Sequence, residues 1–170
     1  MGYVPYVYSM FIRFPNITIL TGSTISEAYV KLTSYGDYST TTLNTDCYFN
    51  AADNATAPTS YSTGEALSFT DAVAWDGIGA WTNGSQYDTP ELKTIMQDIV
   101  DRPGFSSGNA VMFVNEDGGT IGTAYRHPSS YDYSSGNEKA ELHVSYSSDV
   151  SPAITVQAYT SGDSLISTPK

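Results

Sequence analysis

The sequence holds few of the residues that support several common kinds of chemistry. Cys47 is the only cysteine among 170 residues, which excludes an intrachain disulfide and a cysteine-based metal cluster. The two histidines, His127 and His143, lack the spacing of a zinc site. Lysine and arginine number 7 against 18 acidic residues, for a net charge of −11. Because this charge repels phosphate groups and anionic lipid, nucleic acid and membrane surfaces are poor candidate partners.

Long apolar runs and familiar catalytic motifs are also missing. No run approaches the roughly 18 to 20 apolar residues that span a bilayer, so we expect no membrane insertion. The opening residues MGYVPYVYSMF lack the basic start of a signal peptide, which fits either a removed signal or a product released with a particle such as a virion. No GxSxG, HExxH or P-loop pattern occurs, so hydrolase and phosphate-binding mechanisms of those kinds have no support.

What is abundant is tyrosine and the small polar residues, a mixture typical of strands and turns. The clearest alternation lies in residues 25–33, and residues 110–115, AVMFVN, form a continuous apolar run that predicts a central strand buried on both faces. Residues 1–148 are predicted to form one domain, followed by a tail or linker, residues 149–170. Further strands are predicted at 6–14, 17–20, 38–50, 68–75, 120–125 and 140–146, with loops at 51–64 and 76–88.

One segment has helical periodicity. Thr89 is placed to cap the helix, with Pro90 in its first turn, and the sequence Arg-Pro-Gly at 102–104 ends it. Many short strands and one short α-helix, at about 90–101, predict an all-β fold, an antiparallel jelly-roll-like β-sandwich. The predicted apolar face of this helix consists of Leu92, Ile95, Met96, Ile99 and Val100.

Several segments in chain order carry a family resemblance: FIRFPNITI, GSTISEAYVKLT, AADNAT, AVAWDGIGAW, TPELKTIMQDIVDRPGFSSGN, AVMFV and AELHVSY. Together they resemble bacterial and phage β-sandwich surface domains of the DNRLRE type, similar to carbohydrate-binding modules. The resemblance implies glycan binding or a structural role in an assembly, and it brings no catalytic motif. Two departures are Phe105, where the family leads us to expect tryptophan, and the absence of a strand before residue 6.

A missing first strand leaves a sheet edge open. We expect the tail strand at 154–159 to complete that edge, either within the chain or from a neighbouring subunit. The predicted assembly residues are Ile154, Val156 and Tyr159.

Aromatic side chains are the best candidates for ligand binding, because a flat ring stacks on a sugar while Asp and Asn bind its hydroxyls. Tyr131 and Tyr133, set among serine, aspartate and glycine, are our first choice for an exposed contact surface. For the tryptophans in AVAW and GAW, the favoured interpretation is that they are core anchors that pack the loop onto the helix. The predicted ligand-binding residues are Tyr125, Tyr131, Asp132, Tyr133, Trp81 and Tyr87.

The acidic side chains leave two possible roles open, a structural calcium site and a carboxylate-based glycosidase or lyase. Sandwich folds bind structural Ca²⁺ with such oxygens, although an irregular site has no spacing signature. A glycosidase or lyase would need two carboxylates facing one cleft, which the sequence does not reveal. Otherwise we expect no cofactor. The candidate metal ligands are Asp46, Asp53, Asp71 and Asp76.

The functional prediction is a non-enzymatic surface module that binds glycans or stabilises an extracellular or virion assembly, with a phage capsid decoration or a tail or fibre component slightly favoured. The alternative is a carbohydrate-binding module cut from a larger secreted polysaccharide-degrading enzyme or adhesin. The expected partners are polysaccharide or other virion or surface subunits, within an oligomer or larger assembly. The expected location is extracellular, at the cell surface or on a virion.

Overall fold

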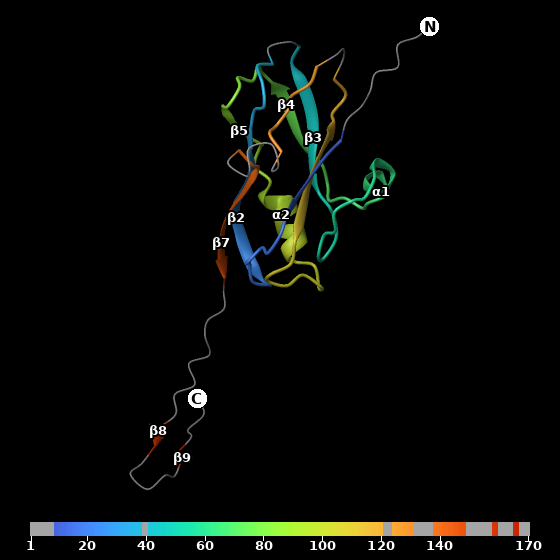
Figure 1. Ribbon diagram of the computed structural model, residues 1–170. Coiled ribbons are helices and arrows are strands. Elements are labelled where there is room, and N and C mark those ends of the chain that lie inside the picture. Colours follow the sequence, from blue (N-terminus) through green and yellow to red (C-terminus); the bar gives the residue numbers. More distant parts are fainter. Residues whose placement is uncertain are drawn as a thin grey trace.

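The protein is an all-β sandwich, as predicted. The computed structural model describes residues 9–38, 41–120, 124–130 and 138–148, together with the backbone of residues 158–159 and 165–166. Two antiparallel sheets lie on either side of the core (Figure 1). The first sheet has the order β1 (Met10–Phe14), β6 (Val111–Asp117), β3 (Leu43–Phe49) and β4 (Val73–Ile78).

The second sheet places the longest strand between two partners. β2 (Ser23–Thr33) pairs with β5 (Gln86–Asp88) on one side and with β7 (Glu141–Ser148) on the other. From β1 to β7, the chain crosses from one sheet to the other at each connection except β3 to β4. Such repeated crossing is typical of jelly-roll winding. In the tail, β8 (Ala158–Tyr159) pairs with β9 (Leu165–Ile166).

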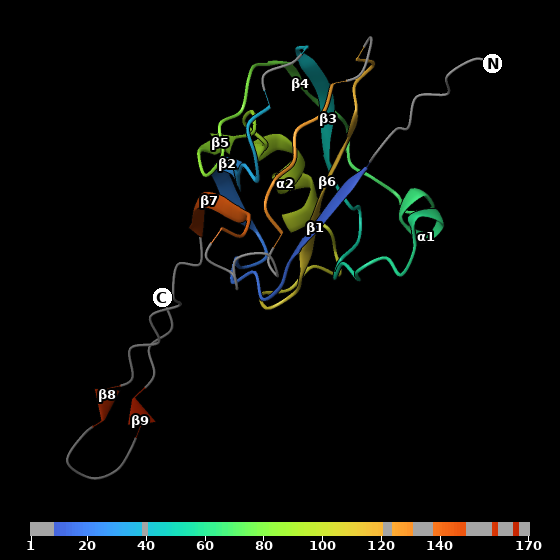
Figure 2. The same ribbon diagram turned by 45° about the horizontal axis from the view of Figure 1, so that its top comes forward.

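The main helix packs inside the sandwich. α2 (Lys93–Val100) lies between β2 and the first sheet in both ribbon views (Figures 1 and 2). Its exposed side carries Lys93, Thr94 and Asp98. This pattern confirms the predicted amphipathic helix, and the five residues of its predicted apolar face are all buried: Leu92, Ile95, Met96, Ile99 and Val100.

The predicted start of this helix is wrong by one turn. The residue before the first turn is Leu92, and it makes no side-chain capping bond. The Thr89 hydroxyl instead accepts a hydrogen bond from the Val30 amide of β2 at 3.0 Å. Glu91 serves the helix end, because its carboxylate accepts bonds from the Lys93 amide at 3.0 Å and from the Ala28 amide at 2.7 Å. Bonding to the neighbouring strand therefore replaces the local cap.

β6 is buried on both faces, which confirms the prediction from its continuous apolar run. Val111 and Phe113 face the main core, whereas Met112 and Val114 belong to a second apolar cluster on the outer side of the first sheet. The segment 51–70 covers that outer side and contributes a buried Ala55. The partly buried residues of this second cluster are Phe11, Tyr48, Leu67 and Phe69.

The covering segment contains a short helix where a loop was predicted. α1 (Tyr61–Glu65) begins at a capping box in which Ser60 and Thr63 each bond to the other's backbone amide. Gly64 lies against the ring of Phe11, where an added Cβ would come within 2.6 Å of a ring carbon. A five-residue helix is too short for hydrophobic periodicity to reveal, and this explains the wrong prediction.

Other local differences have identifiable causes. β4 runs to Ile78, beyond the predicted 68–75, through a bulge at Gly77, whose φ is +70° and whose amide donates to the Asn44 side chain at 2.9 Å. β5 replaces part of the predicted loop 76–88. The predicted strand 17–20 is not formed, although Ile19 is buried. In the predicted strand 120–125, the described positions 120, 124 and 125 are not in a strand.

Carboxylates gather on the outer side of the first sheet beside α1. Asp46 and Glu116 are directly opposed in the pairing of β3 with β6. Ser9 donates to the Glu65 carboxylate at 3.1 Å. Burial raises the pKa of Glu116, and the negative charges of Glu65 and Asp46 raise it further. The ionised form of Glu116 is therefore less favourable in the folded chain than in the unfolded chain.

A raised pKa of Glu116 makes the protein less stable as the pH increases. The stabilising contribution is fully present below the usual glutamate pKa of about 4.3 and is lost as the pH rises through the higher folded value. We expect Glu116→Gln to raise the thermal midpoint at pH 7 relative to the unsubstituted chain, and the gain to vanish below about pH 4. Melting curves across pH 3.5 to 8 measure both effects. Asp71→Asn removes one charge from an exposed loop and serves as the control, and an equal gain in that variant would contradict the prediction.

Candidate functional site

A short backbone pairing extends β2 and brings two distant segments together. The amide of Tyr35 donates to the carbonyl of His127 at 2.8 Å, and the amide of Ser129 donates to the carbonyl of Thr33 at 2.8 Å. On the opposite side, Ser34 is held by the segment at 84–85 through bonds of 2.9 Å in both directions. The backbone at Tyr35 and His127 is therefore fixed side by side, although more than 90 residues of sequence separate them.

Four rings follow one another at this end of the sandwich, and we call Tyr35, His127, Tyr38 and Tyr125 the outer aromatic row. Tyr35 and His127 meet edge to face at a centroid distance of 5.1 Å, as do Tyr38 and Tyr125. Tyr38 also lies 6.5 Å from His127, which links the two pairs. Tyr35 and Tyr125 are 40% and 60% exposed, so the row presents aromatic surface to solvent.

Next to the outer aromatic row, the rings of Trp81, Tyr87 and Trp75 form a second aromatic group. Trp81 is only 3% exposed and stacks on Tyr87 with centroids 4.5 Å apart and planes within 4°. Trp75 lies 6.2 Å from Trp81. The backbones of Tyr38 and Trp81 exchange two hydrogen bonds, of 2.7 and 2.6 Å. These contacts agree with the core-anchor interpretation of Trp81 and leave its ring little surface for a ligand.

A pocket opens beside the row. It has a volume of about 230 Å³ and is lined by Tyr35, His127, Pro128 and Ser130. The lining combines two flat rings with an exposed serine hydroxyl. Flat apolar surfaces next to a few polar groups are what a sugar ring requires, because its two faces are apolar and its rim carries hydroxyls.

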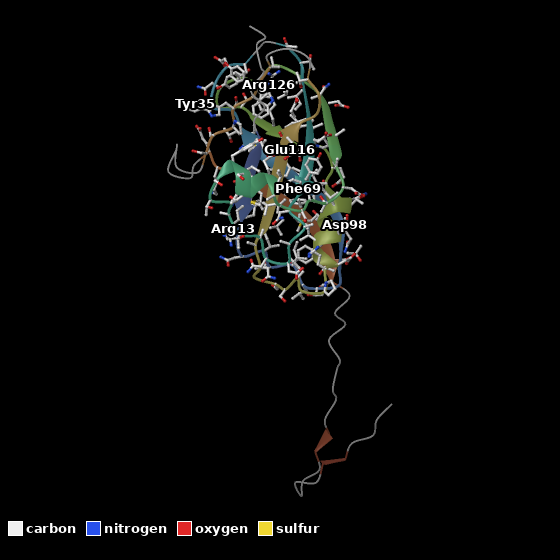
Figure 3. All side chains as sticks on the ribbon, turned by 90° about the vertical axis from the view of Figure 1, so that its right-hand side faces the viewer. Arg13, Tyr35, Phe69, Asp98, Glu116 and Arg126 are labelled. Carbon is white, nitrogen blue, oxygen red and sulfur yellow. The ribbon has the colours of Figure 1, made fainter. Side chains whose placement is uncertain are left out.

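Arg126 holds together the loops that carry the row. Its guanidinium donates to the carbonyls of Gly79 at 2.9 Å, Tyr125 at 2.8 Å, Ile78 at 3.0 Å and Thr41 at 3.3 Å. Partial burial lowers the pKa of Arg126, and Tyr87 opposes that shift. Figure 3 shows Arg126 and Tyr35 at the same end of the molecule. The cation thus serves as a clamp on backbone oxygens, because most of its donors are already occupied.

Tyr38 sits at the centre of the row and stays neutral there. Burial raises the pKa of Tyr38, and the neighbouring Tyr125 and Tyr35 raise it further. Its hydroxyl therefore remains protonated at neutral pH and keeps its capacity to donate and accept hydrogen bonds.

The structure places the predicted binding and assembly residues in different surroundings. Tyr125 lies in the outer aromatic row, whereas Tyr87 is half-buried and its hydroxyl accepts from the Thr82 amide at 2.8 Å. Tyr159 lies in β8, opposite Leu165. Sequence reasoning missed Tyr35, Tyr38 and His127, although the run SYGDYS around the first two is similar in composition to the tyrosine-rich sequence after residue 130. The predictions for Tyr131, Asp132, Tyr133, Ile154 and Val156 lie outside the described residues.

The candidate metal ligands lie apart. Asp53 forms an ion pair with Arg102 at 2.7 Å, and Asp46 opposes Glu116 across two strands. Asp71 precedes β4 and Asp76 lies within it, and both are exposed. Within the described ranges, no group of three or more His, Cys, Asp or Glu side chains is arranged to hold a metal ion.

His143, the histidine outside the aromatic row, packs against the neighbouring strand of the second sheet. His143 is the cross-strand partner of Tyr29, and their rings stack at 4.9 Å with planes 5° apart. Its Nε2 lies 3.5 Å from a carboxylate oxygen of Glu141. His143 is therefore a cross-strand partner on the second sheet.

No helix in the described part of the chain has the length and apolar character needed to cross a membrane.

Comparisons with known proteins give no family for this chain. Searches of protein-family models, curated proteins and solved structures found no match. The resemblance to DNRLRE-type sandwiches therefore stays a prediction, and function has to be argued from the geometry of the aromatic end.

Proposed function

We propose that the protein is a non-enzymatic β-sandwich module that binds glycans through the outer aromatic row and the pocket beside it. The observation that carries this proposal is the presence of two exposed rings, Tyr35 and Tyr125, on a backbone that is fixed from several sides. A rigid ring binds a sugar with little loss of conformational entropy, since few torsions remain to be ordered.

Three features support the proposal. The rings project from loops at the end of the sandwich, where binding residues commonly lie on a rigid scaffold. Ser130 and His127 bring hydrogen-bonding groups to the same pocket as the ring of Tyr35. Trp81, which stacks on Tyr87, pairs its backbone with that of Tyr38 and so ties this ring of the row to the core. Attachment to a virion or cell surface stays a prediction from the sequence.

Substitution of the exposed rings tests the proposal. Burial of roughly 50 Å² of ring surface at about 25 cal/mol per Å² contributes ~1.3 kcal/mol, or about tenfold in affinity. We expect Tyr35→Ala and Tyr125→Ala each to weaken binding about tenfold to whichever oligosaccharide gives the strongest signal on a glycan array, measured by isothermal titration calorimetry.

Tyr61→Ala is the matched control, because Tyr61 is 58% exposed but lies on α1, outside the aromatic row. Its affinity should equal that of the unsubstituted protein. No binding to any glycan on the array, or an equal loss in all three variants, would remove the basis of the proposal.

A further inference from the structure

The extent of the outer aromatic row indicates the size of the glycan it accepts, and this inference rests on the proposed function. We infer that the site binds a linear oligosaccharide of at least three units, with one contact in the pocket beside Tyr35 and a second on the ring of Tyr125. Chain length therefore sets the affinity, because a monosaccharide or a disaccharide uses only part of the site.

The pocket accounts for one end of the row only. Among the described residues, its lining consists of Tyr35, His127, Pro128 and Ser130 and does not include Tyr125. Its volume of about 230 Å³ is smaller than the roughly 300–1,000 Å³ of typical ligand pockets. The pocket therefore holds a short part of a glycan, and the rest of a longer chain has to lie outside it.

The ring of Tyr125 offers a second contact away from the pocket. It is 60% exposed, and it is joined to Tyr35 through the contacts of two intervening rings, His127 and Tyr38. Neighbouring centroids along the row lie 5.1 to 6.5 Å apart, a spacing similar to the length of one pyranose unit in a linear chain. A glycan that touches both Tyr35 and Tyr125 therefore needs several units.

Backbone bonds fix the separation between the two contacts. The Tyr35 amide donates to the His127 carbonyl at 2.8 Å, and the Arg126 guanidinium donates to the Tyr125 carbonyl at 2.8 Å. Arg126 and Tyr35 lie at the same end of the molecule (Figure 3). Because both rings are held in place and the first contact already immobilises the ligand, a second contact on the same chain costs little further entropy.

Oligosaccharide ladders test the inference. The full-length protein is titrated with cello-, xylo-, manno- and malto-oligosaccharides of one to six units, by NMR for weak binding and by calorimetry for tighter binding. On the backbone that binds best, affinity should rise about tenfold between the disaccharide and the tetrasaccharide and level off beyond it, because the ring of Tyr125 becomes covered. Equal affinity from the monosaccharide to the hexasaccharide would overturn the inference.

The two exposed rings should respond differently to ligand length. Tyr125→Ala should leave the affinity for the monosaccharide and disaccharide unchanged and remove the gain of the tetrasaccharide. Tyr35→Ala should weaken binding about tenfold at every length, because its ring lines the pocket. A gain that persists in Tyr125→Ala would come only from the larger number of units able to occupy the pocket, and it would overturn the second contact.

A conservative substitution separates stacking from a purely structural role. Tyr125→Phe keeps the flat ring and its packing against Tyr38, so it should retain the gain with length. A loss as large as that of Tyr125→Ala would overturn the assignment of this ring as a stacking surface. Tyr61→Ala, on α1, is the control and should leave affinity unchanged at every length.

The outcomes separate the two proposals. Binding that does not depend on length but is lost in Tyr35→Ala would overturn the requirement for a chain and uphold glycan binding at the pocket. Binding that survives both Tyr35→Ala and Tyr125→Ala, or no binding to any ladder or any glycan on the array, would overturn the proposed function and the inference together.

Discussion

Replacing Phe113 with alanine is expected to lower the free energy of unfolding by about 3–5 kcal/mol. Phe113 is fully buried in β6, and its ring meets that of Phe49 edge to face at a centroid distance of 6.2 Å. The flanking strands are fixed by backbone pairing on both sides of β6, so the core cannot collapse to fill the lost volume. Urea or guanidinium unfolding monitored by fluorescence measures the change.

The neighbouring residue on the opposite face provides a matched comparison. Met112 is equally buried, but it packs in the second cluster beneath the single segment 51–70. A single layer of chain can move inward to fill a cavity more readily than two paired sheets, so Met112→Ala should cost about 2 kcal/mol. A larger loss in Met112→Ala than in Phe113→Ala would show that the covering segment, and not the space between the sheets, is the main source of stability.

Replacement of Arg126 should have the second large effect, on stability and on binding. Its four bonds to carbonyls join three loops, and their removal should lower the free energy of unfolding by about 2–3 kcal/mol in Arg126→Ala. Arg126→Lys should recover less than half of this loss, because an ammonium lacks the planar arrangement of five donors. Near-UV circular dichroism of the tyrosine and tryptophan rings should change in both variants.

Arg13→Ala is the control for this prediction. The Arg13 guanidinium makes one bond to a backbone carbonyl, that of Ala55 at 2.7 Å, and its loss should cost about 1 kcal/mol or less. Glycan affinity should fall in Arg126→Lys and stay unchanged in Arg13→Ala, since Arg126 positions the carbonyl of Tyr125. Full stability in Arg126→Lys would mean that the positive charge alone, without its geometry, holds the loops.

Periodicity in the sequence predicted the elements whose burial is regular. Ala28, Val30 and Leu32 alternate along β2 and are buried as expected. The continuous run in β6 indicated burial on both faces, and the second face proved to be covered by segment 51–70. In each case, burial decides which residue type occupies a position, so the pattern carries the information directly.

Features set by contacts between distant segments could not be predicted in the same way. Thr89 suits a helix cap, but a bond to the Val30 amide uses its hydroxyl. The outer aromatic row depends on the pairing of 33–35 with 127–129, and neither segment alone shows a signal for it. Trp81 was a candidate ligand contact because of its residue type, whereas its low exposure depends on contacts such as the stacked ring of Tyr87.

The solitary cysteine gives the molecule a natural reporter of its own opening. Cys47 is buried in β3, and burial raises the pKa of its thiol to about 12. A thiol-specific reagent needs both access and the thiolate, so the native thiol is doubly protected. Without a second cysteine in the chain, the labelling signal has a single origin. The rate of labelling under native conditions therefore measures how often the two sheets separate, without any added probe.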